Sequence, residues 1–465
     1  MPQKSFTLNH SMFHWIVLWF VFILKIIFQP TFIFLRICKF IIMKVSELAK
    51  SSRRLISTCG EYNGYLFKQN TRSMLEKVAQ DEGFVDKEIT CYGQVGKGQG
   101  VTGDLFFTNI YALNSNKRLE LLVKQATTTK KVRDYFPVDL FYKNEVNFYD
   151  LVWREFEKQQ QRRLGRLLFD NVPKCYDFNV KPGEECIILQ NLGSKGYRNI
   201  NKREHVPNDI FEHIIKKYAQ FHGLSYVLKK SDPRKYEELS QKFVPYWEQA
   251  QKIVPLRVSI KDVFFKCLQY LKDSSNQDLK NKMNEYSTTG LDVFIQSNTY
   301  KGKNGVFLHG DCWSNNMLFK FTETGELEDL KFIDFQTCKV GSAVYDLSYC
   351  IYSGGSKDIL DNLDYYLKLY HKNLTETCTL MGCEDFISLE ELKQEWKDYC
   401  KFGWIMAMVI LRAKLVNDDA KLDLFLMLTE LEKRKSVAHL EDSDEGEIER
   451  RTLVILEHMH QNGFI

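Results

Sequence analysis

The side chains of Asp311, Asn316 and Asp334 have the types and the order that phosphoryl transfer to an alcohol requires. Asp311 and Asn316 belong to the run H-G-D-C-W-S-N-N, and Asp334 opens the run D-F-Q eighteen residues after Asn316. Such a transfer needs one carboxylate that orients the hydroxyl and accepts its proton, and a second carboxylate that holds magnesium together with a carboxamide. We expect Asp311 to accept the proton, and Asn316 and Asp334 to bind Mg²⁺. His309 is expected to brace the loop.

The alternative is a surface loop in which these Asp and Asn side chains cap helices. The spacing favours the catalytic interpretation, because the five-residue step from Asp311 to Asn316 equals the Asp-to-Asn step of the protein-kinase catalytic loop H-R-D-L-x-x-x-N. Asp334 stands where kinases have the Asp of D-F-G. Because the H-G-D-C-W-S-N-N and D-F-Q runs agree with the kinase motifs in both order and spacing, they predict a phosphotransferase active site.

Lys124 and Glu145 form a second predicted pair. Lys124 follows the apolar run L-E-L-L-V at residues 119–123, and Glu145 lies in the segment 138–158, whose apolar residues recur at helical spacing. A helix glutamate that pairs with a strand lysine would fix that lysine for contact with the phosphates of ATP. Taken alone, both residue types are usually surface charges. Their order before the H-G-D and D-F-Q runs favours the binding role.

A glycine-rich run at residues 93–103 lies between two predicted strands ahead of Lys124. We expect the backbone amides of Gly96, Gly98 and Gly100 to cover the phosphates of ATP. A plain hairpin turn is the alternative, because a glycine-rich turn is a weak signal by itself.

The run Q-N-L and a histidine in the run F-H-G-L-S complete the candidate residues. Gln190 and Leu192, in Q-N-L, stand where a hinge segment would contact the adenine. His222 is expected to be a core histidine with satisfied hydrogen bonds. The pocket for the phosphoryl acceptor is expected among the helices that follow Asp334.

The sequence at these motifs resembles the ecdysteroid kinase-like family, also called CHK kinase-like. The resemblance extends over about residues 60–430 and rests on V-F-L-H-G-D-C-W-S-N-N-M-L-F at 306–319, I-D-F-Q at 333–336 and A-V-Y-D-L-S at 343–348. The family is related to choline and aminoglycoside phosphotransferases. The resemblance implies ATP and Mg²⁺ as cofactors and a small-molecule hydroxyl, such as that of a steroid or a xenobiotic, as the acceptor.

A sheet-rich first half and a helix-rich second half must position these residues. Strands are predicted at residues 89–92, 105–112, 119–123, 171–179 and 185–189, with a helix at 138–158. Helical spacing dominates from residue 208 onward, except for a strand pair formed by residues 305–308 and 317–321 and an extended run at 330–333. This order is α+β and predicts a bilobal protein-kinase-like fold, with an antiparallel sheet and one helix in the N-lobe and a mainly helical C-lobe.

The first 43 residues differ in composition from the rest of the chain. Residues 12–35 are apolar and long enough to cross about 30 Å of hydrocarbon. We expect either a membrane anchor or, if Met43 is the functional start, a gene-model extension. The predicted domains are the apolar segment 1–43, an ATP-binding N-lobe at 44–192, a C-lobe with the catalytic loop and acceptor site at 193–435, and an acidic tail with a terminal helix at 436–465.

The charge balance and the cysteines indicate which classes of partner and which cellular compartment to expect. The 64 basic and 60 acidic residues are mixed along the chain, without the basic stripe that nucleic-acid binding requires. The 12 cysteines are scattered and form no C-x-x-C pair, which predicts reduced core thiols in a cytoplasmic catalytic domain. Nucleic acid is therefore not expected as a partner, and no specific protein partner is indicated.

Two other functions stay open at this point. A protein Ser/Thr kinase would need an A-P-E element after an activation segment, whereas Asp346 follows Asp334 by only twelve residues. A catalytically silent binding protein of the same fold would be free to lose the residues of the predicted centre, and all of them are present. The sequence favours an active small-molecule kinase.

Overall fold

The computed structural model describes residues 67–94, 102–249, 251–415 and 444–465. The candidate membrane anchor at residues 12–35 and the candidate phosphate-covering glycines Gly96, Gly98 and Gly100 lie outside these ranges. Within the described ranges, no helix combines the length and the apolar character that a membrane crossing requires.

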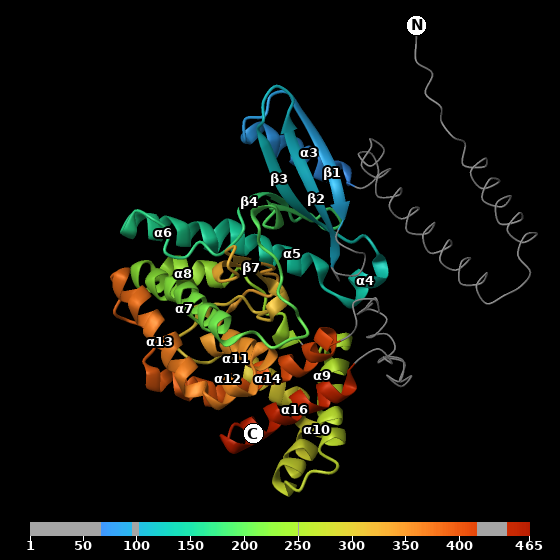
Figure 1. Ribbon diagram of the computed structural model, residues 1–465, viewed down its shortest axis with the longest axis vertical. Helices are drawn as coiled ribbons and strands as arrows, with labels where there is room; N and C mark the ends of the chain where they lie inside the picture. Colours follow the sequence, from blue (N-terminus) through green and yellow to red (C-terminus); the bar gives the residue numbers. More distant parts are fainter. Residues whose placement is uncertain (1–66, 95–101, 250, 416–443) are drawn as a thin grey trace, which may run out of the picture. The chain divides into compact units, whose positions relative to one another are not determined.

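A five-stranded antiparallel sheet with the strand order β1-β2-β3-β5-β4 forms the N-lobe (Figure 1). Its strands are β1 (Lys87–Gln94), β2 (Gly103–Ala112), β3 (Arg118–Ala126), β4 (Cys175–Asn179) and β5 (Cys186–Gln190). Helix α3 (Gln69–Asp81) packs on this sheet and buries Leu75, Val78 and Ala79. The strand predicted at 171–179 is real but shorter at its start.

The two faces of β3 determine where Lys124 points. Leu121 and Val123 are fully buried, and Gln125 accepts a hydrogen bond from the hydroxyl of Thr71 in α3 at 2.9 Å. Because successive side chains of a strand point to opposite faces, Lys124 faces away from α3. Strand alternation thus places the lysine on the side of the sheet that meets the rest of the protein.

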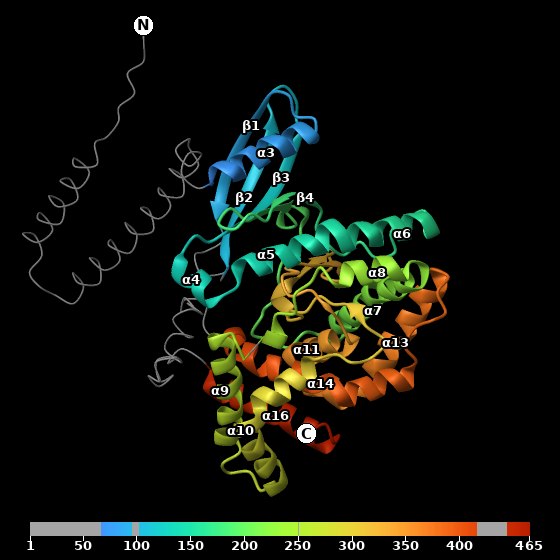
Figure 2. The ribbon, with the colours of Figure 1, turned by 180° about the vertical axis from the view of Figure 1, so that it is seen from behind.

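The helix predicted at 138–158 is continuous but not regular. It consists of α5 (Val138–Asn147), a π-helical segment η1 (Phe148–Trp153) and α6 (Arg154–Leu164). A π-helical turn inserts a residue into the helical repeat and often occurs at functional sites. The helices lie between the sheet and the helices of the C-lobe in both views (Figures 1 and 2). They therefore reach both lobes.

Helices build most of the C-lobe (Figure 2). The longer ones are α7 (Asn208–Ser231), α8 (Pro233–Ser240), α9 (Val254–Tyr270), α10 (Gln277–Asn298), α11 (Ala343–Gly354), α13 (Leu363–Leu380), α14 (Leu389–Leu415) and α16 (Glu445–Gln461), with the short α12 (Lys357–Asp361) beside them. The short helix α4 (Lys130–Tyr135) instead follows β3 of the N-lobe sheet. Helix α11 is buried along its whole length and forms the centre of the C-lobe.

The predicted pairing of residues 305–308 with 317–321 is wrong. Strand β6 (Val306–Phe307) pairs with β9 (Val340–Gly341), and β7 (Met317–Phe321) pairs with β8 (Leu327–Phe332). The polar loop between β6 and β7 is not a hairpin turn, because these two strands do not pair with each other. Within it, Gly310 adopts a left-handed φ of 85° and Ser314–Asn316 form a 3₁₀ turn. This loop carries the candidate catalytic residues.

Close packing of α11 against α14 depends on Gly403. A Cβ atom at this position would overlap the backbone of Ser348 and Tyr349 in α11. Glycine at this crossing lets the two helix backbones approach to a distance that no other residue allows. The position of α11 in the C-lobe is therefore fixed by α14.

We expect Gly403→Ala to lower the free energy of unfolding by about 3 kcal/mol, because the added methyl group must push the two helices apart. The melting temperature, measured by calorimetry, checks this. Gly446→Ala is the matched control in α16, where a Cβ would meet only Asp444 Oδ1 at 3.8 Å. It should leave stability unchanged or raise it by up to about 1 kcal/mol. Equal melting temperatures for the two variants would contradict the packing argument.

Candidate active site

Lys124, Glu145 and Asp334 meet at one point, and they come from three separate elements. The Lys124 ammonium donates to Glu145 Oε2 at 2.6 Å and to Asp334 Oδ1 at 2.6 Å. Strand β3 provides the lysine, α5 provides the glutamate, and the turn after β8 provides the aspartate. The predicted pairing of Lys124 with Glu145 is present, and it extends to Asp334.

Burial and charge keep this lysine protonated. The Glu145 side chain is 1% exposed, that of Lys124 is 12% exposed and that of Asp334 is 28% exposed. Burial lowers the pKa of the Lys124 ammonium, but the two carboxylates more than offset it, so the pKa lies above its ordinary value. Burial raises the pKa of Glu145, and Lys124 opposes the rise. A charged ammonium that remains accessible on the Asp334 side can contact an anion.

Asp311 accepts hydrogen bonds on both of its carboxylate oxygens. Asn316 Nδ2 donates to Oδ2 at 2.8 Å, and the hydroxyl of Tyr349 donates to Oδ1 at 3.0 Å. Burial, together with the nearby charge of Asp334, raises the pKa of Asp311 to about 7. A carboxylate with a pKa near neutrality is well matched to accept a proton from an alcohol.

A second aspartate, Asp346 in α11, holds the loop around Asp311 from behind. Its carboxylate accepts the backbone N–H of His309 at 2.7 Å and that of Gly310 at 2.9 Å. The His309 ring lies against the backbone carbonyl of Ile333, with Nε2 at 2.8 Å, and its Nδ1 accepts from the Asp311 amide at 3.2 Å. These contacts connect the catalytic loop to the segment that carries Asp334.

The segment after β8 has an unusual backbone and an aromatic anchor. Asp334 has a φ of 69° and is the one non-glycine residue with positive φ among the described residues. Phe335 follows it and stacks on Phe148 of the π-helical segment, with ring centroids 3.6 Å apart. The His309 ring lies 4.5 Å from the same phenylalanine. The π-helical turn, the catalytic loop and the Asp334 turn thus share one aromatic cluster.

The remaining candidate residues fall into two groups. Gln190 ends β5 and pairs with Leu121 of the central strand, and Leu192 is buried two residues later. Their contact with the adenine stays a prediction. His222 is a core histidine as predicted, because its ring nitrogens lie 2.9 Å from the Tyr370 hydroxyl and 3.2 Å from Asp346 Oδ2.

Sequence reasoning assigned no role to Asp346 or Trp247, and it named Tyr349 only as a candidate lining residue of the acceptor pocket, without its contact with Asp311. The indole N–H of Trp247 donates to the carbonyl of Gly310 at 3.1 Å and supports the catalytic loop from the segment before α9. One signal was available: Asp346 is an acidic residue within the otherwise apolar helical run A-V-Y-D-L-S-Y-C-I-Y. A buried carboxylate needs hydrogen-bond donors, which predicts a structural partner for it.

The oxygen atoms near Asp334 and Asn316 suit Mg²⁺. The Asn316 amide nitrogen donates hydrogen bonds to Asp311 O and Oδ2. The carbonyl oxygen of the Asn316 side chain therefore remains available as a metal ligand. Mg²⁺ prefers such hard oxygen ligands and usually takes few of them from the protein, with the rest from water and phosphate. The described residues contain no cluster of three or more acidic, histidine or cysteine ligands. The donor set fits a magnesium ion that arrives with a nucleotide.

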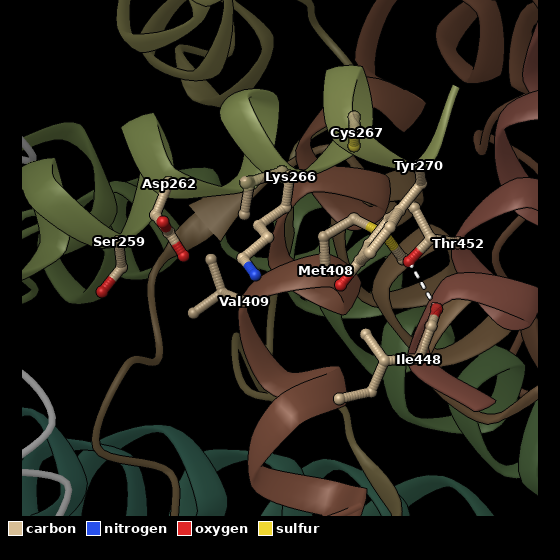
Figure 3. A pocket seen from close by; sticks show the side chains of 10 residues that line it. Ser259, Asp262, Lys266, Cys267, Tyr270, Met408, Val409, Ile448 and Thr452 are labelled. Atoms are coloured by element: carbon tan, nitrogen blue, oxygen red, sulfur yellow. Dashed lines mark hydrogen bonds between the residues drawn. The ribbon is translucent and has the colours of Figure 1, made fainter. Parts of the chain in front are cut away.

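Two cavities of the described C-lobe lie apart from these residues. The larger is a groove of about 570 Å³ whose lining includes Glu248 and Lys339. The smaller, of about 40 Å³, is lined by side chains of α9, α14 and α16, among them Thr452 (Figure 3). Since neither is lined by Asp311 or Lys124, neither is assigned to the phosphoryl acceptor.

The model of the ecdysteroid kinase-like family matches residues 97–383, which is more than half of the chain. The chain belongs to the ecdysteroid kinase-like family. All residues of the ion-paired centre and the catalytic loop of this ecdysteroid kinase-like protein lie within the matched range. The predicted family and the predicted α+β, bilobal kinase-like fold are confirmed.

Two further comparisons set this ecdysteroid kinase-like chain beside curated proteins and solved structures. A comparison with curated proteins found no match. Among solved structures, it is similar to that of APH(2'')-IIia, an aminoglycoside phosphotransferase, in complex with GDP and kanamycin. The identity is 13% and the TM-score 0.37, over 79% of this chain and 100% of that chain.

We expect Asp346→Asn to loosen the catalytic loop of this ecdysteroid kinase-like protein. The amide group offers one acceptor oxygen to two backbone donors and turns its own N–H₂ toward one of them. The change should lower the free energy of unfolding in urea by about 3 kcal/mol. Asp292→Asn, an exposed position on α10, is the control and should leave it within about 0.5 kcal/mol. A urea midpoint for Asp346→Asn equal to that of the unchanged protein would refute the supporting role of Asp346.

Proposed function

We propose that this chain transfers the γ-phosphate of ATP to a hydroxyl group of a small molecule. One observation carries the proposal: Asp334 accepts a hydrogen bond from the Lys124 ammonium at 2.6 Å, and its charge acts on the nearby carboxyl group of Asp311, which Asn316 holds at 2.8 Å. A proton acceptor, a cation for phosphate and a carboxylate for magnesium are thus combined at one site. Phosphoryl transfer needs all three.

Each residue of the site has a distinct role in the proposal. Lys124, held by Glu145, contacts the phosphates of ATP. Asp334 and Asn316 hold Mg²⁺, which neutralises charge on the phosphates when it is bound. Asp311 orients the acceptor hydroxyl and takes its proton, and His309 keeps the loop in place. Gln190 and Leu192 bind the adenine.

The acceptor is proposed to be a small-molecule alcohol, such as a steroid or a xenobiotic. A protein acceptor is disfavoured because only seven residues lie between Asp334 and Ser342, whose side chain caps the start of α11. This leaves no length for the activation segment and A-P-E element of protein kinases. A nucleic-acid acceptor is not proposed. Use of ATP places the catalytic domain with the cytosolic nucleotide pool.

Asp311→Asn and Asp334→Ala should separate proton acceptance from nucleotide binding. Asp311→Asn should lower ADP formation about 10²–10⁴-fold, because the proton acceptor is lost, while ATP affinity stays the same. Asp334→Ala should weaken ATP binding in Mg²⁺ at least about tenfold, because a metal ligand is removed. Calorimetric titration with ATP and Mg²⁺, and an ADP-release assay with pooled hydroxyl compounds, measure both effects.

The exposed Asp292 provides matched controls, since Asp292→Asn and Asp292→Ala should change neither quantity. Native turnover in Asp311→Asn would rule out Asp311 as the proton acceptor. ATP affinity in Mg²⁺ that Asp334→Ala leaves unaltered would rule out Asp334 as a metal ligand. Unchanged protein that binds ATP yet forms no ADP with any pool would support a catalytically silent binding protein instead.

A further inference from the structure

Two cysteines stand on either side of the turn that ends α13. Cys378 lies in the last turn of the helix, and Cys383 follows the helix in the run C-T-L-M-G-C at residues 378–383. Both are free thiols, and neither belongs to the candidate active site. Because the sequence contains no C-x-x-C pair, these two residues are recognised as partners only in the folded turn.

The backbone of this turn brings the two cysteines together. The N–H of Cys383 donates to the carbonyl of Cys378 at 2.8 Å, and the N–H of Gly382 donates to the carbonyl of Thr379 at 3.0 Å. Gly382 has the left-handed φ of 67° that this closure needs. The two bonds define a Schellman motif, in which the side chains of the residues joined by the first bond usually make an apolar contact. Here both of those side chains are thiols.

The two thiols face each other and differ in acidity. They lie within hydrogen-bonding range of one another. The contact with Cys378 holds the pKa of the Cys383 thiol below its ordinary value, and the positive charge of Lys230 lowers it further. The same contact, together with burial, raises the pKa of Cys378. Cys383 therefore loses its proton first, and the thiolate is the form that reacts.

Cys383 lies next to the surface, whereas Cys378 is anchored in the core. Cys383 is 2% exposed and stands between two exposed residues, Gly382 and Glu384. Cys378 is fully buried, and its Sγ lies 3.9 Å from the carbonyl oxygen of Gly223 in α7, the helix beside α13 (Figures 1 and 2). Opening of one short turn exposes Cys383 without separating the packed helices. A reagent from solution therefore meets Cys383 first.

We propose that Cys378 and Cys383 are a redox-active pair, which a small-molecule disulfide such as glutathione disulfide converts into an intramolecular disulfide. The Cys383 thiolate attacks one sulfur of glutathione disulfide, whose S–S bond breaks and releases one glutathione. The Cys378 thiol then loses its proton and attacks the Cys383 sulfur, which releases the second glutathione. Two protein thiols are oxidised, one glutathione disulfide is reduced, and the two cysteine protons end on the two released glutathione molecules.

The alternative is a pair of inert core thiols that only fill the turn. The two interpretations differ in what folding does to the chemistry. A pair that the turn holds together forms its disulfide more readily in the folded protein than in the unfolded chain, because the fold has already brought the two sulfur atoms together. Inert thiols gain nothing from folding.

Mass spectrometry of the full chain detects the disulfide within one peptide. Trypsin releases residues 373–393, which contain these two cysteines and no other. The reduced protein is equilibrated with mixtures of reduced glutathione and glutathione disulfide and quenched with acid, and its free thiols are alkylated in urea before digestion. We expect an unalkylated peptide that is lighter than the reduced peptide by two hydrogen atoms and carries no glutathione. Cys267 of α9 is the internal control and should remain alkylated.

Serine variants separate the two steps. Cys378→Ser removes the second thiol, so the peptide should retain one glutathione on Cys383. Cys383→Ser removes the attacking thiol, and Cys378 should take up glutathione at least about tenfold more slowly than Cys383 does in the other variant, because its thiol is buried and less acidic. Cys267→Ser is the matched control and should form the disulfide as the unchanged protein does. Equal rates of uptake in the first two variants would overturn the order of attack.

The same equilibrium in urea tests the role of the folded turn without any variant. The folded protein should become half-oxidised at a ratio of glutathione disulfide to reduced glutathione at least about tenfold lower than the unfolded chain requires. Equal ratios for the two states would overturn the proposal. A peptide that stays fully alkylated, that carries glutathione on both cysteines, or that is linked to a second copy would overturn it as well.

Discussion

The contact of Lys124 with Glu145 and Asp334 determines how the two lobes serve one site. It joins β3 to residues 21 and 210 positions later in the chain, and it is the point where an N-lobe cation meets a C-lobe carboxylate. Buried ion pairs add little net stability, because desolvation offsets their attraction, but they specify geometry. Here the Lys124 ammonium donates to the carboxylates of both Glu145 and Asp334. A nucleotide that brought its own anions and a magnesium ion would satisfy the lysine and Asp334 separately, which makes this contact the natural place for ligand exchange.

Contacts with helices and with an aromatic cluster support the loop that carries Asp311. The backbone N–H groups of His309 and Gly310 donate to the buried carboxylate of Asp346, outside the loop. Trp247 holds its Gly310 carbonyl from another side, and the Phe335 cluster joins it to the π-helical segment. A site held within a fraction of an ångström requires such supporting contacts. The close packing of α11 on α14 supplies the fixed frame for all of them.

Local patterns in the sequence were enough to predict the main residues of the candidate site. The spacing of Asp311 and Asn316, and the placement of Lys124 after an apolar run and of Glu145 in a helix, predicted contacts that the structure contains. The contacts of Tyr349 and Asp346 with the catalytic loop could not be predicted in this way, because they span 36 to 38 residues and depend on how α11 packs. The pairing of β6 with β9 was missed for the same reason: two-residue strands carry no periodic signal, and their partners lie far apart in the chain.

The central claim is that this chain moves a phosphoryl group from ATP to an alcohol. Phosphorus-31 NMR of the full chain, incubated with ATP, Mg²⁺ and pooled small hydroxyl compounds that include steroids and xenobiotics, tests it most directly. The account predicts a phosphomonoester resonance that appears together with ADP, and only when protein, Mg²⁺ and a hydroxyl compound are all present. ATP that binds the protein yet remains intact with every pool would contradict the account.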